Sequence, residues 1–356
     1  MKSKTQYNVI GLMSGTSLDG VDIAFCSFEL KEKAWSFDIL RAETIPYSVS
    51  WKNRLSSVEK ETAYEFVLTD IEYGRLLGKL TRNFIMKYNI SPEIISSHGH
   101  TIFHQPGKKV TCQIGKGSSI ASETGYPVVC DFRSLDVALG GQGAPLVPIG
   151  DQHLFSEFEF CLNLGGFANI SYESDGKRTA YDICPVNIVL NHLAGTVGKP
   201  YDPSGEMASI GTLSQTLLTS LNQLPYYHQG HPKSLGKEWV VGNIHPLLES
   251  SSLRLNDQLT TFCEHIAMQI ANATTHIQSG RILVTGGGAY NEFLMERINY
   301  HTGHQIIIPD DNTVNFKEAL IFAFLGILRW REEINCISSV TGATKDSVGG
   351  AIYLNR

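Results

Sequence analysis

The order of strand-like and helix-like segments occurs twice along the chain, and this constrains the fold more than any other feature. The first round begins with apolar segments at residues 7–13 and 21–30 and an alternating segment at 35–44. A second round begins near residue 158, with three strand-like segments separated by glycine or Asp-Gly turns. Short apolar runs bounded by turn residues indicate buried strands, and alternation indicates half-buried ones. The two rounds therefore predict two α/β domains of similar topology.

Helix-like segments follow the strands in both rounds. A regularly spaced apolar stripe predicts a long helix over residues 63–88. Further helices are expected over residues 206–224, 255–277, 291–300 and 316–330, and further strands over 94–97, 110–114, 127–130, 158–164, 167–172, 178–183 and 281–284. Three strands followed by helices, occurring twice, is the topology of a duplicated ribonuclease-H-like domain, although no sequence repeat is visible. We expect one lobe over residues 1–130 and another over 131–356, and leave open that the C-terminal residues return to the first lobe.

The length and composition are those of a folded protein with two domains. At 356 residues, the chain exceeds the size at which a single hydrophobic core stops growing. Its formal charge of −6 argues against nucleic acid as a partner, because phosphate binding needs a basic face. No apolar stretch approaches the ~18 residues that a membrane span needs, and the N-terminus has no signal segment. Seven cysteines without a Cys-x-x-Cys pair fit reduced thiols in a cytoplasmic protein.

A turn rich in glycine and hydroxyl residues joins the first two expected strands, over residues 15–20. It is not a Walker A loop, because it has no Gly-Lys-Ser/Thr and no helix follows it. Its backbone N–H groups and hydroxyls can nonetheless receive an anion. Asp19 and Asp22 could hold a Mg²⁺ ion that accompanies phosphates, through water. An ordinary polar hairpin is the alternative that the local sequence leaves open.

Three consecutive glycines, Gly286 to Gly288, follow an expected buried strand and open an expected helix. Glycines let a ligand approach the backbone closely, and a helix N-terminus favours phosphate. Glycine-rich turns are also common without any ligand. The pattern therefore predicts a nucleotide contact here without requiring one.

Two other polar positions are candidates for chemistry. Asp182 ends an expected strand, where a general base facing a cleft would sit, although a plain helix N-cap is the alternative. His98, His100 and His104 suggest a metal site, but no partner of familiar spacing completes the set. We favour polar substrate contacts or packed histidines. The run 140–145 is not a dinucleotide fingerprint, because it ends in proline and follows no clear strand of a βαβ unit.

Over essentially its whole length, the chain resembles the anhydro-N-acetylmuramic acid kinases. The resemblance begins with a nearly letter-for-letter match to the family's opening signature at residues 11–22. The other matching blocks are His98-Gly99, Asp131-Phe132-Arg133, residues 140–145, 163–166, 232–234 and 286–291, Glu318-Ala319, and residues 340–343. Each block is short, but their common order and spacing make chance a poor explanation.

The resemblance implies a specific fold and reaction. Members of this family have the actin-like ATPase and sugar-kinase fold, with two ribonuclease-H-like lobes and an ATP cleft between them. They use ATP and Mg²⁺ to phosphorylate 1,6-anhydro-N-acetylmuramic acid at O6 while water opens the anhydro bridge. The product, N-acetylmuramic acid 6-phosphate, belongs to peptidoglycan recycling and amino-sugar catabolism. The resemblance also implies a homodimer.

Residue by residue, Asp182 matches the family's catalytic base. The positions that match the ATP site are Gly15, Thr16, Ser17, Leu18, Asp19, Gly20, Val21, Asp22, Gly286, Gly287, Gly288 and Asn291, with Asp19 toward Mg²⁺. Those that match the sugar site are Ser14, His98, Arg133, Gln142 and Glu318.

The chain departs from the family pattern beside the chemistry. A Thr-Gly-Pro-Gly run is usual after the catalytic aspartate, whereas this chain has Ile183-Cys184-Pro185-Val186. If that loop needed a positive φ at either lost glycine, the replacement would cost about 1–3 kcal/mol. His100 also stands where glutamine is usual. Two alternatives therefore stay open: a kinase or ATPase of this fold that acts on a different sugar, and a catalytically weakened nucleotide-binding regulator.

Overall fold

The computed structural model describes residues 4–15 and 18–355 in two compact units. The first unit comprises the described residues up to Leu154 together with those from Phe316 onward, and the second comprises Phe155–Asn315. These limits differ from the boundary at residue 130 that we expected from sequence. The segment 131–154, which forms short helices, and the C-terminal segment from Phe316 both belong to the first unit.

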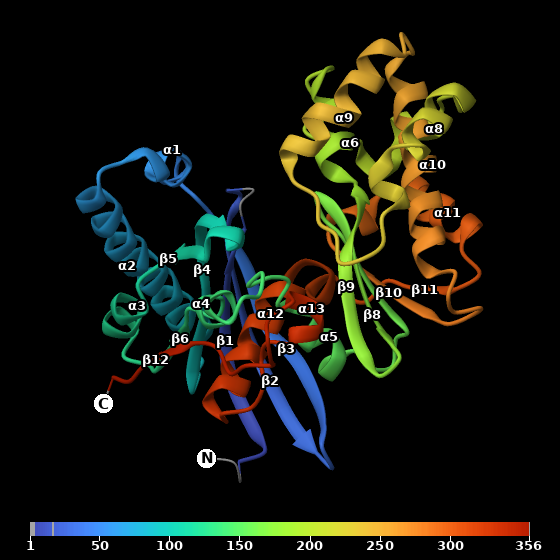
Figure 1. The fold of residues 1–356 in the computed structure, drawn as a ribbon. Coiled ribbons are helices and arrows are strands. Elements are labelled where there is room, and N and C mark those ends of the chain that lie inside the picture. Colours follow the sequence, from blue (N-terminus) through green and yellow to red (C-terminus); the bar gives the residue numbers. More distant parts are fainter. Residues whose placement is uncertain (1–3, 16–17, 356) are drawn as a thin grey trace. The chain divides into compact units, whose positions relative to one another are not determined.

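A seven-stranded mixed sheet forms the centre of the first unit (Figure 1). Its strands are β1 (Gln6–Ser14), β2 (Gly20–Lys31), β3 (Ala34–Pro46), β4 (Ile94–Gln105), β5 (Val110–Ile114), β6 (Val128–Cys130) and β12 (Ala351–Tyr353). They lie in the order β12-β6-β4-β1-β2-β3, and β5 pairs with β4. Strands β1, β2 and β3 form an antiparallel meander, and β4 runs parallel to β1. The turn between β1 and β2 therefore lies at the same end of the sheet as the end of the parallel strand β4.

Helices cover the sheet of the first unit. They are α1 (Val49–Ser57), α2 (Ala63–Tyr88), α3 (Gly117–Thr124), α4 (Ser134–Ala138), α5 (Val147–Leu154), α13 (Ser338–Thr341) and α12 (Asp311–Trp330), whose residues from Phe316 on belong here. Helix α2 has the bounds expected from its apolar stripe, because Thr62 caps its N-terminus and Asn89 ends it in the left-handed conformation. Helix α12 packs against β1 so closely that a Cβ on Gly11 would lie 1.9 Å from the Ala319 carbonyl oxygen.

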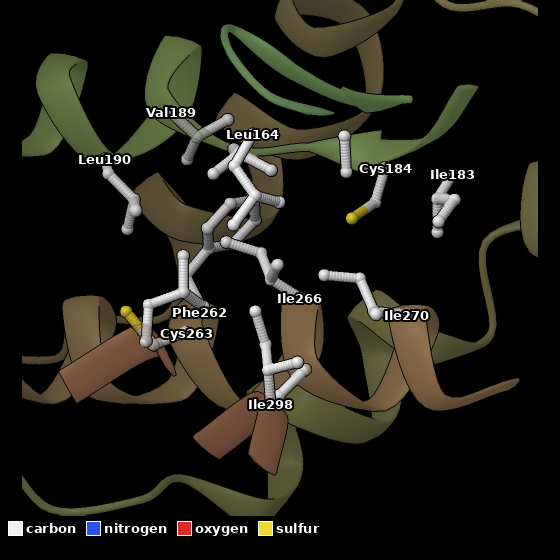
Figure 2. Close-up of a cluster of buried hydrophobic side chains, with 14 of the residues drawn as sticks. Leu164, Ile183, Cys184, Val189, Leu190, Phe262, Cys263, Ile266, Ile270 and Ile298 are labelled. Atoms are coloured by element: carbon white, nitrogen blue, oxygen red, sulfur yellow. The ribbon is translucent and has the colours of Figure 1, made fainter. Parts of the chain in front are cut away.

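A five-stranded sheet in the order β11-β10-β7-β8-β9 forms the centre of the second unit. Its strands are β7 (Phe160–Leu164), β8 (Phe167–Ser174), β9 (Lys177–Pro185), β10 (Arg281–Thr285) and β11 (Gln305–Ile307). The longer helices are α6 (Asn187–Gly195), α8 (Gln215–Asn222), α9 (Lys237–Ser250), α10 (Leu255–Thr274) and α11 (Glu292–His301), with α7 (Glu206–Ser209) as one short turn. Figure 2 shows the core, in which Ile266 and Ile270 of α10 lie with Cys184 of β9 and Ile298 of α11.

The two sheets have the same strand arrangement. In each, an antiparallel meander of three strands is extended from its first strand by strands parallel to it: β4 and β6 in the first unit, β10 and β11 in the second. This confirms the expected fold class of two ribonuclease-H-like α/β lobes. No helix in the described part of the chain is long and apolar enough to cross a membrane.

Some helix expectations were wrong in detail. The helix expected over residues 206–224 is broken, because Gly211 lies against α10, where a Cβ would come within 2.2 Å of the Asn256 carbonyl oxygen. Helix α9 was not expected, and it contains both Gly242 and Pro246. Tertiary packing overrides weak local propensity in both places.

The contact between β1 and α12 generates a stability prediction. We expect Gly11→Ala to lower the free energy of unfolding by about 3 kcal/mol, because the new methyl group would overlap backbone that cannot rotate away. Gly107→Ala is the matched control, since no heavy atom lies within 4 Å of a Cβ there. Urea unfolding of both variants measures the difference. Equal stability of the two variants would contradict this packing.

Candidate active site

The β1–β2 turn carries several of the residues assigned to ATP. Leu18 takes a left-handed backbone conformation with φ 60°, and its N–H donates to the Gly15 carbonyl oxygen at 3.3 Å. Gly20 begins β2 against β3, where a Cβ would lie 2.4 Å from the Ile45 carbonyl oxygen. Thr16 and Ser17, also assigned to ATP, lie outside the described residues. Gly20, the first residue of β2, thus has no room for a side chain.

Two carboxylates from distant parts of the chain lie near this turn. Asp22 in β2 accepts a hydrogen bond from Thr44 Oγ1 at 2.6 Å, and burial together with the Asp19 charge raises its pKa. Burial also raises the pKa of Glu318 on α12, and the charge of Asp22 raises it further. A carboxylate whose proton affinity is raised by a neighbouring carboxylate, as in both of these residues, favours a nearby cation.

Asp19 and Asp22, whose charges interact, suit a Mg²⁺ ion that is bound together with phosphates. Their oxygens are the hard ligands that this ion prefers. Within residues 4–15 and 18–355, no group of three or more histidine, cysteine, aspartate or glutamate side chains forms a metal cage. Such a site suits an ion that keeps several waters and takes other oxygens from its substrate.

The buried His98 and the partly buried Arg133 form a hydrogen-bonded pair in the first unit. Arg133 donates to His98 Nε2 from Nε at 3.1 Å and from Nη2 at 2.9 Å, so His98 Nδ1 carries the proton and donates to the Gly99 carbonyl oxygen. Burial and then the Arg133 charge hold the pKa of His98 well below its usual value. Burial lowers the pKa of Arg133 to about 10, which leaves it cationic at neutral pH. His98 therefore positions Arg133 and is not a metal ligand.

Asp136, which the sequence analysis missed, holds the glycine loop of residues 140–145. Its Oδ2 accepts from the Gly143 N–H and its Oδ1 from Thr341 Oγ1, both at 2.7 Å. Arg133 Nη1 donates to the Gly143 carbonyl oxygen at 2.7 Å, which ties Arg133 to the same loop. The side chain of Gln142 is exposed. The sequence signal that could have identified Asp136 is an aspartate shortly before the run Gly140-Gly141.

Ser14, the last residue of β1, is hydrogen-bonded to His100 in the middle of β4. Ser14 Oγ and His100 Nδ1 lie 2.9 Å apart, and both residues are buried. Burial lowers the pKa of His100 to about 4, so the imidazole is neutral at physiological pH. His100 thus supplies a neutral polar group at the position where glutamine is usual in the family that the chain resembles.

In the second unit, Asp182 lies near the end of β9 with both carboxylate oxygens bonded. Asn169 Nδ2 donates to Oδ1, and the Leu235 N–H donates to Oδ2 at 2.8 Å. Burial raises the pKa of Asp182, and these two hydrogen bonds partly offset that rise. Helix α6 begins only at Asn187 and has no side-chain cap. Asp182 is therefore not an N-cap, and its charge is stabilised by donors from two other segments.

A row of polar residues connects Asp182 to the glycine turn. In the sheet register, Thr285 of β10 pairs with Asn163 of β7, Asn163 with Asn169 of β8, and Asn169 with Asp182. Register partners on adjacent strands point to the same face of a sheet. Four neighbouring strands thus present one polar row. Asn163 lies in the matching block at residues 163–166, whereas Asn169 was not among the expected site residues.

The glycine turn differs from its expectation at the helix. Gly286 has φ 83°, and a Cβ on it would lie 2.7 Å from Asn163 Oδ1, so the turn packs directly on the end of β7. A short 3₁₀ turn over Gly287–Tyr290 follows, and α11 begins only at Glu292. The Asn291 side chain caps α11 by accepting from the Leu294 N–H at 3.0 Å. We had expected the glycines to open the helix, but they precede it by a 3₁₀ turn. Asn291 Oδ1 is already used to cap the helix.

The segment that departs from the family pattern continues a strand. Ile183, Cys184 and Val186 are buried, and none of the residues 183–186 has a positive φ. Figure 2 shows Ile183 and Cys184 within the core of the second unit. Glycine is not needed there, and the penalty considered from sequence does not arise.

Comparison with known proteins gives one consistent family. The family model described as anhydro-N-acetylmuramic acid kinase matches residues 7–355. The anhydro-N-acetylmuramic acid kinase of Sulfurimonas denitrificans is 33% identical, with 97% of this chain and 98% of the relative covered. That of Vibrio vulnificus strain YJ016 is 32% identical, with 99% of both covered. Among solved structures, the activator of the 2-hydroxyisocaproyl-CoA dehydratase from Clostridium difficile has 14% identity and a TM-score of 0.45, over 91% of this chain and 96% of that one.

The low pKa of His100 predicts acid sensitivity. A buried neutral histidine contributes stability above its unfolded pKa of 6.5, and that contribution is lost as the pH falls toward about 4. We expect His100→Gln, which keeps a polar partner for Ser14, to reduce the loss of unfolding free energy between pH 7 and pH 4 by up to about 3 kcal/mol. Denaturant unfolding at a series of pH values measures it. If wild type and His100→Gln lost the same unfolding free energy between pH 7 and pH 4, the burial argument would be contradicted.

Proposed function

The chain belongs to the anhydro-N-acetylmuramic acid kinase family, and on that premise we propose how its own residues carry out the reaction. It opens the 1,6-anhydro bridge of anhydro-N-acetylmuramic acid with water and phosphorylates the freed O6 from ATP. The observation that carries this proposal is Asp182, a partly buried carboxylate with two fixed donors at the end of a polar row that leads to the glycine turn.

Asp182 acts as the general base. Its carboxylate takes a proton from the water whose oxygen attacks C1, the C1–O6 bond breaks, and O6 accepts the γ-phosphoryl group as ADP leaves. A carboxylate that activates water opposite a departing sugar oxygen is the logic of an inverting glycosidase. No separate acid is needed, because phosphorus captures the departing oxygen. The bonds from Asn169 and Leu235 orient the carboxylate and keep it ionised.

The β1–β2 turn and the glycine turn bind the nucleotide. Phosphoryl transfer depends on positioning and charge neutralisation, which backbone N–H groups can supply. Asp19 and Asp22 would hold Mg²⁺, which neutralises phosphate charge when bound. Arg133, fixed by His98, and Glu318 contribute a cation and a carboxylate toward the sugar. We also propose that the enzyme works in the cytoplasm as a homodimer, as the family resemblance implies.

Replacing the base tests the proposal. We expect Asp182→Asn to lower kcat for sugar phosphorylation by at least about 10²-fold while ATP binding is retained, because an amide cannot take the proton from water. Asp175→Asn is the matched control, since Asp175 is exposed in the β8–β9 turn and asparagine tolerates its positive φ. Mass spectrometry of the product and a separate ATP titration give both readouts. An Asp182→Asn enzyme with control-like turnover would refute the mechanism.

The pH dependence of activity tests the role of Asn169. Because burial raises the pKa of Asp182, we expect kcat/KM to fall, as pH decreases, at a pH above the ordinary aspartate value. Removing the Asn169 donor destabilises the ionised form, so Asn169→Ala should move this acid limb to higher pH. The pH–rate profiles of both proteins measure the shift. An unmoved acid limb would show that Asn169 does not act on Asp182.

A further inference from the structure

A cluster of hydroxyl groups lies beside the β1–β2 turn, and the mechanism above does not use it. The Tyr47 hydroxyl lies 2.6 Å from Ser14 Oγ and is also hydrogen-bonded to the Tyr73 hydroxyl. Ser14 in turn bonds to His100. All four side chains are buried, and Tyr73 of α2 has no exposed surface. Buried polar networks whose members are all bonded hold a single arrangement.

Tyr47 contacts both sides of the turn. Its hydroxyl bonds to Ser14, the last residue of β1 before the turn. Its backbone N–H donates to the carbonyl oxygen of Asp19, the last residue before β2, at 3.4 Å. Tyr47 itself follows β3, which pairs with β2 as far as Gly20 opposite Pro46. One residue therefore bonds to both ends of the segment that joins β1 to β2.

The side of the cluster away from the turn is rigid. The Tyr73 ring packs against the rings of Tyr47 and Trp51, with centroids 6.2 and 5.6 Å apart. Burial raises the pKa of both tyrosines, so both hydroxyls keep their protons at neutral pH. The network is then uncharged and does not compete with a bound phosphate for a cation. Tyr47 thus places a neutral hydroxyl, held by the packing of Tyr73, beside the turn.

We propose that Tyr47 is a positioning residue for ATP, which holds the two ends of the β1–β2 turn at the separation that the phosphates require. The role of Tyr47 rests on the proposed function in one respect, which is that the β1–β2 turn binds ATP. Small misplacements of groups that position a substrate produce large losses of rate. Loss of the hydroxyl removes the bond to Ser14 and leaves only the backbone bond to Asp19, so Tyr47 no longer connects the two ends of the turn.

The test compares two buried tyrosines of the same unit. Tyr47→Phe removes the hydroxyl beside the turn. Tyr7→Phe is the matched control, because the buried Tyr7 hydroxyl accepts from Arg331 Nη1 at 3.1 Å, and Tyr7 lies near the start of β1, away from the turn. The readouts are the Kd of a non-hydrolysable ATP analogue with Mg²⁺ by calorimetry, the KM for ATP, the KM for the sugar, and the melting temperature.

We expect Tyr47→Phe to raise the Kd of the analogue and the KM for ATP about tenfold, the loss of roughly one hydrogen bond. The KM for the sugar should stay within about twofold of wild type. Tyr7→Phe should lower the melting temperature to a similar degree and leave both ATP constants within about twofold. A purely structural role of Tyr47 would affect the two variants alike, and that result would overturn the proposal.

Two further outcomes separate this inference from the proposed function. If the wild type makes no sugar phosphate but Tyr47→Phe still weakens analogue binding, the substrate assignment fails and the positioning role stands. A wild type that does not bind the analogue overturns the inference. Should Tyr47→Phe not fold, Ser14→Ala removes the same bond from the other side, and unchanged analogue affinity in Ser14→Ala would also overturn it.

Discussion

The packing of helix α12 on the sheet of the first unit holds the site residues of that unit in position. No side chain separates the helix from β1 at Gly11 and Ala319, and at Gly326 the helix packs against the side chain of Ser96 in β4. Close backbone packing of this kind leaves the helix little freedom to slide or rotate. Glu318 is next to Ala319, so its carboxylate is set near Asp22 and Arg133 by the packing of the backbone. The neighbouring Lys317 forms a buried ion pair with Asp151 of α5 at 2.7 Å, which adds a second constraint on the helix.

In the second unit, the pairing of strands in the sheet holds the site residues in position. The polar row from Thr285 to Asp182 crosses four strands. Within this row Asn169 donates a hydrogen bond to Asp182, and the glycine turn packs on Asn163. The carboxylate is thus partly buried yet bonded, which suits a base that must stay ionised without being fully solvated.

Patterns that are local in sequence could be predicted, and patterns created by folding could not. The strand order, the long helix α2 and the positions of the β1–β2 turn, Asp182 and the glycine turn follow from periodicity, turn residues and family motifs. The partners of Asp182 do not, since Leu235 is 53 residues away and binds through its backbone. Asp136 meets Thr341 across 205 residues for the same reason. The departure at residues 183–186 raised a concern about backbone strain that only the observed φ values could remove.

The most direct test of the account is the mass of the product formed from anhydro-N-acetylmuramic acid, ATP and Mg²⁺ in water enriched in oxygen-18. Coupled ring opening requires a product heavier than the substrate by one phosphoryl group and one water, with the heavy oxygen on the sugar and none in the transferred phosphoryl group. A product that gains the phosphoryl group without water would contradict the role given to Asp182. The absence of any product, with ATP still bound, would contradict the substrate assignment.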